Sequence, residues 1–308
     1  MKLKNLKEKF AKGELDKISY IDQMYEQHSI LFNYAEFIKN TNIDSIEIMD
    51  NLVIAKFRDS NIRFICIPGD KRLAPLDTLN FDEYEKNELE MQYKLIPATA
   101  NIIDIGANLG WYSMHVAKNF PQSQVYAFEP IPRTFEFLNQ NIKINNISNI
   151  ITYQLGLSDQ SGELNLYFDP LLSVNASLQN VSESENAQKI TCTIVTLDEF
   201  CYKNNIKQVD FIKCDVEGAE LFALKGGKKI ISDSQPIIFC EMLRKWSKKF
   251  NYHPNDIISF MSELNYKCFV IRGKSLEFIN QVTDETTDTN FIFLHSLKHQ
   301  QQITQFVK

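Results

Sequence analysis

The segment NIIDIGANLGWYS, residues 101–113, limits the fold of this chain more than any other segment does. Apolar residues of β type lead to Asp104, a short turn carries Gly106 and Gly110, and a stretch with helical spacing follows. This order is typical of the first strand, loop and helix of a nucleotide-binding α/β fold, in which the backbone closely approaches the ligand at the carboxyl end of the strand. We therefore expect a nucleotide site at this loop.

The glycine spacing of the loop does not fit a dinucleotide site. A pyrophosphate loop has the pattern G-x-G-x-x-G, whereas here Asn108 holds the second glycine position and Trp111 the third. A ligand that ends in an amino acid fits better, because Asp104 could pair with an ammonium and backbone amides near Asn108 and Gly110 could hold a carboxylate. S-adenosylmethionine has such an end. The alternative is a structural turn without a ligand.

A second acidic residue, Glu129, ends the strand-like run QVYAFEP. An acidic side chain at the tip of the second strand can accept hydrogen bonds from ribose hydroxyls. The alternative is an exposed carboxylate at the start of the helix that begins near Pro132. Glu129 therefore supports a nucleoside, but it does not separate a nicotinamide cofactor from S-adenosylmethionine.

From residue 101 onward, strand and helix patterns alternate, which predicts a parallel sheet with right-handed crossovers. The strand patterns cover 101–105, 123–129, 150–157, 209–214 and 237–241. The helical patterns cover 110–119, 132–146, 218–232 and 254–264. An antiparallel pair joined by a polar loop is expected at 163–170 and 189–197, and two closing strands at 266–271 and 291–296.

Residues 1–96 follow other patterns. Helical spacing runs to about residue 40, SIEIMDNLVIAKF predicts a hairpin around Asp50 and Asn51, and IRFICI predicts a third strand. The segment 68–80 is typical of a loop, and 81–96 predicts a helix. We expect a helical and β-hairpin extension over 1–96, which could also serve homo-oligomer formation, and a nucleotide-binding domain over 97–308.

Charge and cysteine usage limit the partners and the compartment. The net charge of −6 disfavours nucleic acid as a partner, because phosphate binding relies on an excess of Lys and Arg. The six cysteines are scattered without a C-x-x-C pair, which favours a reduced, cytoplasmic protein without structural zinc. No apolar run reaches the roughly 18 residues of a membrane span. The lysine-rich start lacks the apolar core of a signal peptide.

The motifs DIGANLGWYS, FEP, GLSDQSGE and VDFIKCDVEGAELFALKGG together resemble those of the FkbM family of S-adenosylmethionine-dependent methyltransferases, over roughly residues 75–271. The resemblance implies a class I methyltransferase fold, an α/β Rossmann-like sheet of seven strands with the last antiparallel. It also implies O-methylation of a hydroxyl on a glycan or a secondary metabolite. By position, the cofactor residues would be Asp104, Gly106, Asn108, Gly110 and Glu129, with Gly156 and Leu157 beside the adenine.

The segment KCDVEGAE, residues 213–220, carries the candidate catalytic residues. Asp215 and Glu217 are expected at the carboxyl edge of the sheet, where ligands of open α/β folds bind. We take Asp215 as the candidate base for a hydroxyl proton, with Glu217 and His253 in reserve. The structural alternative is that Lys213, on the same face as Asp215, pairs with a carboxylate and that Asp215 caps the next helix.

Glu241 is expected to reach the same crevice as these residues. Asp215, Glu217, Glu241 and His253 are residue types that bind divalent cations, but the sequence offers only the types, and we expect no metal. Two other functions stay open. A nicotinamide-dependent oxidoreductase fits the α/β pattern but lacks the third glycine and a Tyr-x-x-x-Lys pair. A protein that binds S-adenosylmethionine or a partner without catalysis is the second.

Overall fold

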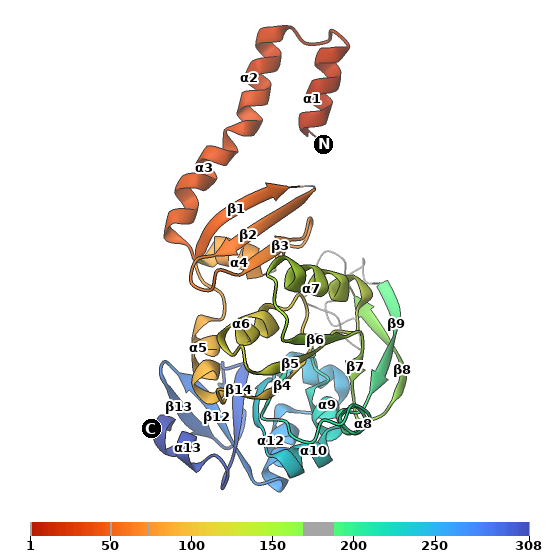
Figure 1. Ribbon diagram of the computed structural model, residues 1–308, viewed down its shortest axis with the longest axis vertical. Helices are drawn as coiled ribbons and strands as arrows, with labels where there is room; N and C mark the ends of the chain where they lie inside the picture. Colours follow the sequence, from red (N-terminus) through yellow and green to blue (C-terminus); the bar gives the residue numbers. More distant parts are fainter. Residues whose placement is uncertain (1, 50, 73, 169–187, 308) are drawn as a thin grey trace.

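A mostly parallel sheet of eight strands forms the centre of the protein (Figure 1). The computed structural model describes residues 2–49, 51–72, 74–168 and 188–307. Across the sheet the strands are β13 (Ser275–Ile279), β12 (Tyr266–Arg272), β14 (Asn290–His295), β11 (Ile237–Glu241), β10 (Phe211–Cys214), β4 (Asn101–Ile105), β5 (Gln124–Phe128) and β6 (Ile150–Tyr153). The α/β class predicted from the sequence is confirmed.

The strand directions are those expected for the predicted class. Strands β11, β10, β4, β5 and β6 are parallel, and β14, the last in sequence, is antiparallel to both β11 and β12. The eighth strand, β13, was not predicted. It pairs antiparallel with β12 at the edge of the sheet, after a turn at Gly273.

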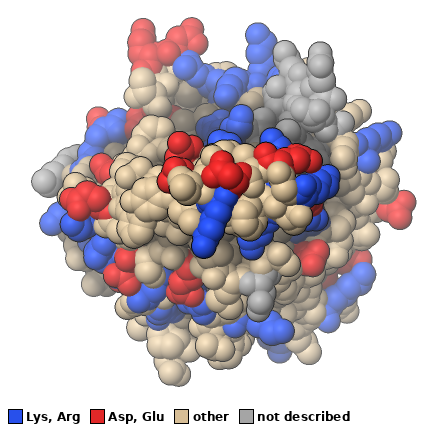
Figure 2. Space-filling view, turned by 90° about the horizontal axis from the view of Figure 1, so that it is seen from above, with Lys and Arg blue, Asp and Glu red and all other residues tan. Residues whose placement is uncertain are grey.

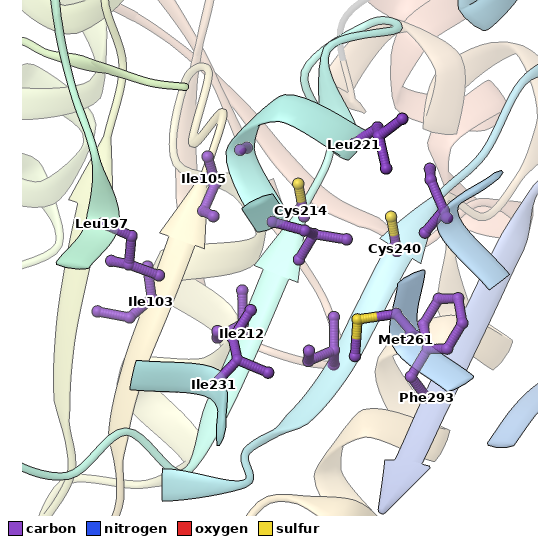
Figure 3. Packing of buried hydrophobic residues seen from close by; sticks show 14 of the residues in the cluster. Ile103, Ile105, Leu197, Ile212, Cys214, Leu221, Ile231, Cys240, Met261 and Phe293 are labelled. Carbon is purple, nitrogen blue, oxygen red and sulfur yellow. The ribbon is translucent and has the colours of Figure 1, made fainter. Parts of the chain in front are cut away.

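Helices cover both faces of this sheet. One face carries α8 (Leu197–Lys203), α9 (Glu220–Lys225), α10 (Lys228–Ser234) and α12 (Pro254–Glu263), and the other carries α5 (Lys86–Leu95), α6 (Trp111–Asn119) and α13 (Gln300–Phe306). In the first layer, Ile212 and Cys240 of neighbouring strands pack near Ile231 and Met261 (Figure 3). Burial raises the pKa of the Cys240 thiol well above its usual value, so this cysteine packs as a neutral apolar side chain.

Two predicted elements are divided. The strand expected over 150–157 ends at β6, and β7 (Gly156–Leu157) joins a second sheet, ordered β7-β9-β8, with β9 (Gln188–Val195) and β8 (Gly162–Phe168). The helix expected over 218–232 separates into α9 and α10 around Gly226, where a Cβ would lie 2.0 Å from the backbone oxygen of Ser158. The antiparallel pairing of β8 with β9 is confirmed. The polar loop between them and residues 169–170 lie outside the described residues.

The extension contains the predicted three-stranded arrangement. Strands β1 (Ile43–Met49), β2 (Leu52–Phe57) and β3 (Arg63–Cys66) form an antiparallel sheet, and Asn51 of the predicted turn has φ 68°. Asp50, the other turn residue, lies outside the described residues. The strand β3 is bound to α7 (Pro132–Ile144) and its C-terminal end, since Arg63 N and Ile65 N donate to Asn145 Oδ1 and Asn141 Oδ1 at 2.8 and 3.0 Å.

The prediction of a loop over 68–80 is wrong, because α4 (Ala74–Phe81) occupies most of this segment. Its buried residues Ala74, Pro75, Thr78 and Leu79 have helical spacing, and a proline is tolerated in a first helical turn, where its missing N–H is not needed. The helix predicted over 81–96 is confirmed only as α5, which begins at Lys86. A domain boundary at residue 96 stays a prediction.

A helical arm, α1 (Lys2–Ala11), α2 (Lys17–His28) and α3 (Ile30–Phe37), stands beyond the small sheet at one end of the molecule (Figure 1). Among its residues only Leu6 is buried, and Ile21, Leu31 and Phe32 are exposed. Lys and Arg side chains mix with Asp and Glu side chains on the face seen in Figure 2, without a continuous field of one sign. No described helix has the length and apolar character needed to cross a bilayer.

Candidate functional site

A cavity of about 460 Å³ opens at the carboxyl ends of β4, β5, β10 and β11. This volume lies in the range of small-molecule sites, and this sheet edge is where open α/β folds bind ligands. Its walls include the loop 105–112, the strand β7, the segment 213–219 and residues from 64–92 of the extension, together with residues at the ends of β5 and β11. The extension is therefore one wall of the candidate site.

The structure brings seven of the ten predicted site residues to the cavity. They are Gly106, Asn108, Glu129, Gly156, Leu157, Asp215 and Glu217. Glu241, expected in the same crevice, also lines it. Three predicted residues, Asp104, Gly110 and His253, are not among the lining residues.

The loop after β4 passes directly over the end of β10. Gly106 has φ +79°, and a Cβ at this position would lie 1.9 Å from the backbone oxygen of Asp215. Only glycine fits such a close approach in a left-handed backbone. Lys213 Nζ donates to the backbone oxygen of Gly106 at 3.0 Å and so fixes the loop to the neighbouring strand.

Glu129 holds the other side of this loop. The residue is 5% exposed, and its carboxylate accepts hydrogen bonds from Asn108 N at 3.0 Å and from Ile131 N at 2.9 Å. Burial raises the pKa of Glu129 to about 7, although both backbone amides act in the opposite direction. Glu129 therefore has a structural role at the tip of β5, and it also lines the cavity, as a ribose contact requires.

Asp104 lies beneath the cavity. Its side chain is fully buried, Ser113 Oγ donates to it at 2.5 Å, and Lys213 Nζ lies 3.6 Å away. Lys213 Nζ also lies 3.2 Å from Asp215 Oδ2. The predicted pairing of Lys213 with a carboxylate is confirmed, and it involves two carboxylates, because Asp104 and Lys213 are paired in register on adjacent strands.

Three carboxylates meet at the ends of β10 and β11. Oxygen atoms of Asp215, Glu217 and Glu241 all lie within 4.8 Å of one another. Burial, followed by the charge of Asp215, raises the pKa of Glu217 to about 8, and the same two causes raise the pKa of Glu241 well above its usual value. Carboxylates in this arrangement can hold or accept a proton near neutral pH.

His253, another candidate of the sequence analysis, has a structural position. His253 caps α12, since its Nδ1 accepts from Asn255 N at 3.2 Å and its backbone N donates to Asp256 Oδ2 at 2.7 Å. Asp215 does not cap a helix, because the next helix, α9, begins only at Glu220. Glu220 is 2% exposed, and its carboxylate accepts from two backbone amides of the preceding loop.

Sequence reasoning missed the polar residues that the extension contributes to the cavity. Tyr84 packs edge-on against Trp111 with ring centroids 5.2 Å apart, and Arg72, Asp77 and Gln92 line the cavity as well. The sequence position of Gln92 could have indicated its role. It lies three residues after Leu89 and three before Leu95 on the buried face of α5, where a polar residue is unexpected.

Comparisons with known proteins agree with this geometry. A family model described as the methyltransferase FkbM domain matches residues 104–268. Methyltransferase 1 of Beauveria bassiana is 31% identical over 147 residues, which are 42% of this chain and 59% of that protein. Hexuronic acid methyltransferase AglP of Haloferax volcanii is 30% identical over 123 residues, 40% of this chain and 48% of that protein.

A further relative is the 2-O-methyltransferase NoeI of Sinorhizobium fredii, which is 24% identical over 147 residues, 44% of this chain and 60% of that protein. Each of these three matches spans less than two thirds of the relative's own length. The family model, in contrast, covers more than half of this chain and both segments that form the sheet edge of the cavity, the loop after β4 and residues 213–220. The chain belongs to the FkbM methyltransferase family.

Proposed function

We propose that this protein is an S-adenosylmethionine-dependent methyltransferase that methylates a hydroxyl group of a glycan or of a secondary metabolite. One observation carries the proposal. Glu129, which we propose for the ribose hydroxyls, lines the cavity at the same sheet edge as Asp215 and Glu217, which we propose for the proton. The three carboxylates stand at the ends of β5 and β10, with the loop after β4 between them.

Residues on both sides of Glu129 support a nucleoside site. Gly156 and Leu157 of β7 line the cavity and offer a small, apolar wall suited to an adenine ring. The loop from Gly106 to Gly110 has no third glycine for a pyrophosphate, since Trp111 fills that position and packs against Tyr84. Family membership and this loop both weigh against a nicotinamide-dependent oxidoreductase.

The reaction requires little covalent chemistry from the chain. Bound S-adenosylmethionine supplies an electrophilic methyl group. The residues of the cavity must hold the acceptor hydroxyl in line with the methyl–sulfur bond, at about 3 to 3.5 Å from the methyl carbon. An alcohol is a poor nucleophile while it keeps its proton, so a base that takes the proton adds about 10²- to 10⁴-fold to the rate.

We assign to Asp215 the role of the base that accepts the hydroxyl proton, with Glu217 as the second candidate. Lys213 Nζ, 3.2 Å from Asp215 Oδ2, fixes the orientation of the Asp215 carboxylate. Glu217, with a pKa raised to about 8, can exchange a proton close to neutral pH. His253 has no support for a catalytic role, because it caps α12 and is not among the residues that line the cavity.

The names of two relatives support a hydroxyl acceptor, and one of them supports a sugar acid. One is named for hexuronic acid and the other for 2-O-methylation. Asp77, Glu217 and Glu241 line the part of the cavity that is not assigned to the nucleoside, and carboxylates accept hydrogen bonds from sugar hydroxyls. A hydroxylated secondary metabolite is the second acceptor class. Both classes are small molecules, in line with the volume of the cavity.

The test is release of S-adenosylhomocysteine by the full chain in the presence of glycan and polyol acceptors. We expect Asp215→Asn to lower turnover by about 10²-fold or more with cofactor affinity nearly unchanged. Glu129→Ala is expected to weaken cofactor binding in calorimetry. Binding of S-adenosylmethionine without turnover on any acceptor would favour the non-catalytic alternative. Full activity of Asp215→Asn would exclude Asp215 as the base.

A further inference from the structure

The cavity has two chemically different ends. The end formed by the second sheet, β7-β9-β8, is lined mainly by apolar side chains, which suits an adenine ring. The end formed by the extension and by the carboxyl ends of β10 and β11 is lined by charged side chains, and it is the end left for the acceptor. The apolar side chains include Leu155, Leu157, Leu164 and Ile194, and the charged ones include Asp77, Glu85, Asp215, Glu217 and Glu241.

Glu85 has an unusual backbone at the charged end. It closes the connector 82–85 between α4 and α5 and has φ 46° and ψ 33°, a left-handed conformation that residues with a side chain rarely adopt. Glu85 holds the N-cap position of α5, yet its side chain makes no hydrogen bond to the amides of this fully described helix. The side chain is accessible and lines the cavity instead. Backbone strain of this kind is concentrated at ligand sites.

The connector lies close to the carboxylates of the sheet edge. The protein that encloses the cavity desolvates Glu85 and, with the charge of Asp215, raises its pKa to about 7, whereas the charge of Lys213 acts in the opposite direction. The adjacent Tyr84 packs edge-on against Trp111, and its hydroxyl donates a hydrogen bond to Glu85. Glu85 and Asp215 are therefore near neighbours that reach the acceptor end from two different walls, the extension and the strand β10.

This pair of carboxylates limits the chemistry of the acceptor. An ionised carboxylate only accepts hydrogen bonds, so a ligand between two such groups must offer at least two donors. In the proposed reaction, Asp215 takes the proton of the hydroxyl that is methylated. Glu85, on the other wall, is left to accept from a second hydroxyl. Hydroxyls on adjacent ring carbons, as sugars carry them, provide two donors at close spacing.

We propose that Glu85 selects the acceptor by binding the hydroxyl next to the one that is methylated, so that the acceptor is a vicinal diol of a sugar ring. This inference rests on the proposed function and narrows its acceptor to glycans, against metabolites with one isolated hydroxyl. It also assigns the choice of acceptor to the extension, because Glu85 lies before the predicted boundary at residue 96.

The test measures methyl transfer by the full chain to methyl glycosides of hexoses and hexuronic acids and to their monodeoxy counterparts. Glu85→Gly is expected to raise the KM for the glycoside by about tenfold or more, the range of a lost hydrogen bond to a charged group. The kcat and the calorimetric affinity for S-adenosylhomocysteine are expected to change by less than about twofold, because Glu85 holds the acceptor equally in the ground state and in the transition state.

The monodeoxy glycosides identify the bond itself. The wild type is expected to prefer the parent glycoside about tenfold or more in kcat/KM over the counterpart that lacks the neighbouring hydroxyl. In Glu85→Gly this preference is expected to fall below about twofold, because the partner of that hydroxyl is gone.

Asp82→Gly is the matched control. Asp82 belongs to the same connector, has φ 71°, is exposed and is not among the residues that line the cavity. Glycine adopts a left-handed backbone without strain, so both substitutions are expected to leave the melting temperature equal or higher. Only Glu85→Gly is expected to change the KM for the glycoside. If Glu85→Gly does not fold, Glu85→Gln, which keeps the size of the side chain, carries the test.

Three results would overturn the inference: an unchanged KM for the glycoside, weaker binding of S-adenosylhomocysteine in Glu85→Gly, or the same preference over the monodeoxy glycoside in wild type and variant. Turnover of alicyclic mono-alcohols without turnover of any glycoside would also overturn it. Absence of turnover on every acceptor would instead contradict the proposed function, so the two failures are distinguishable.

Discussion

Substitution of Gly106 by alanine tests the contact on which the site is built. The backbone at Gly106 has φ +79°, and the added Cβ would lie 1.9 Å from the backbone oxygen of Asp215. Gly273 offers a matched control. It has φ +61° in the turn between β12 and β13, and a Cβ there would have no atom within 4 Å. Both substitutions carry the same type of backbone penalty, but only Gly106→Ala collides with the chain.

The expected changes in the free energy of unfolding follow from the backbone cost and the steric cost. A left-handed backbone costs an alanine roughly 1–2 kcal/mol, which is the whole expected effect of Gly273→Ala. Forcing an extra methyl group into packed surroundings costs about a further 1–3 kcal/mol. Gly106→Ala is therefore expected to lower the free energy of unfolding by about 2–5 kcal/mol. The backbone of Asp215 cannot relax freely, because its N donates to the oxygen of Ile105 at 3.1 Å.

Urea unfolding of the two variants and of the wild type, analysed by linear extrapolation, measures the difference. Calorimetry with S-adenosylhomocysteine on the same samples reports on the site. Gly106→Ala is expected to lower both stability and affinity, since it displaces the loop that Lys213 holds to β10. Gly273→Ala is expected to leave affinity unchanged. Equal loss of stability in the two variants would refute the close approach of Gly106 to Asp215.

The remaining predictions concern protons, metal ions and association. The pKa of Glu129 is raised from 4.5 to about 7, so the folded chain keeps a proton that the unfolded chain has lost, and stability is expected to fall as pH rises across this window. Glu129→Gln should flatten that fall in urea titrations from pH 5 to 8, and an unchanged slope would contradict the burial of Glu129. Turnover is expected to rise toward pH 8 as Glu217 loses its proton. Glu217→Gln should remove this rise from the pH profile of kcat. If the rise persists in the variant, another group causes it. Turnover should survive EDTA, because Lys213 already places a positive charge beside Asp215, and loss of activity that Mg²⁺ restores would refute this. The exposed apolar side chains of α2 and α3 lead us to expect self-association through the arm. Light scattering should show a dimer or a larger species, which Ile21→Asp and Phe32→Asp should dissociate. A monomeric wild type would contradict this expectation.

The elements with strong local patterns were predictable from the sequence. The strand β4, its loop and α6 matched 101–119, because apolar alternation, a turn with glycines and helical spacing follow one another there. Strand pairing in the extension was predictable for the same reason. The seven predicted residues that line the cavity follow from four motifs and from the rule that ligands bind at the carboxyl edge of such sheets.

The features that the sequence did not predict depend on contacts between distant segments of the chain. The break between α9 and α10 falls at Gly226, which lies against Ser158, and no local pattern records that contact. The cofactor role of Asp104 stays a prediction; its side chain is fully buried beneath the cavity, with Lys213 Nζ of the neighbouring strand 3.6 Å away. The wall from α5 was missed because Gln92 reaches the site only through the packing of the extension on α6.

The most direct test of the account is a crystal structure of the full chain with S-adenosylhomocysteine. The account predicts ribose hydroxyls within hydrogen-bond distance of Glu129, adenine against Gly156 and Leu157, and the sulfur facing the carboxylates of Asp215 and Glu217. A ligand bound elsewhere, or bound in this cavity without contact to Glu129, would contradict it.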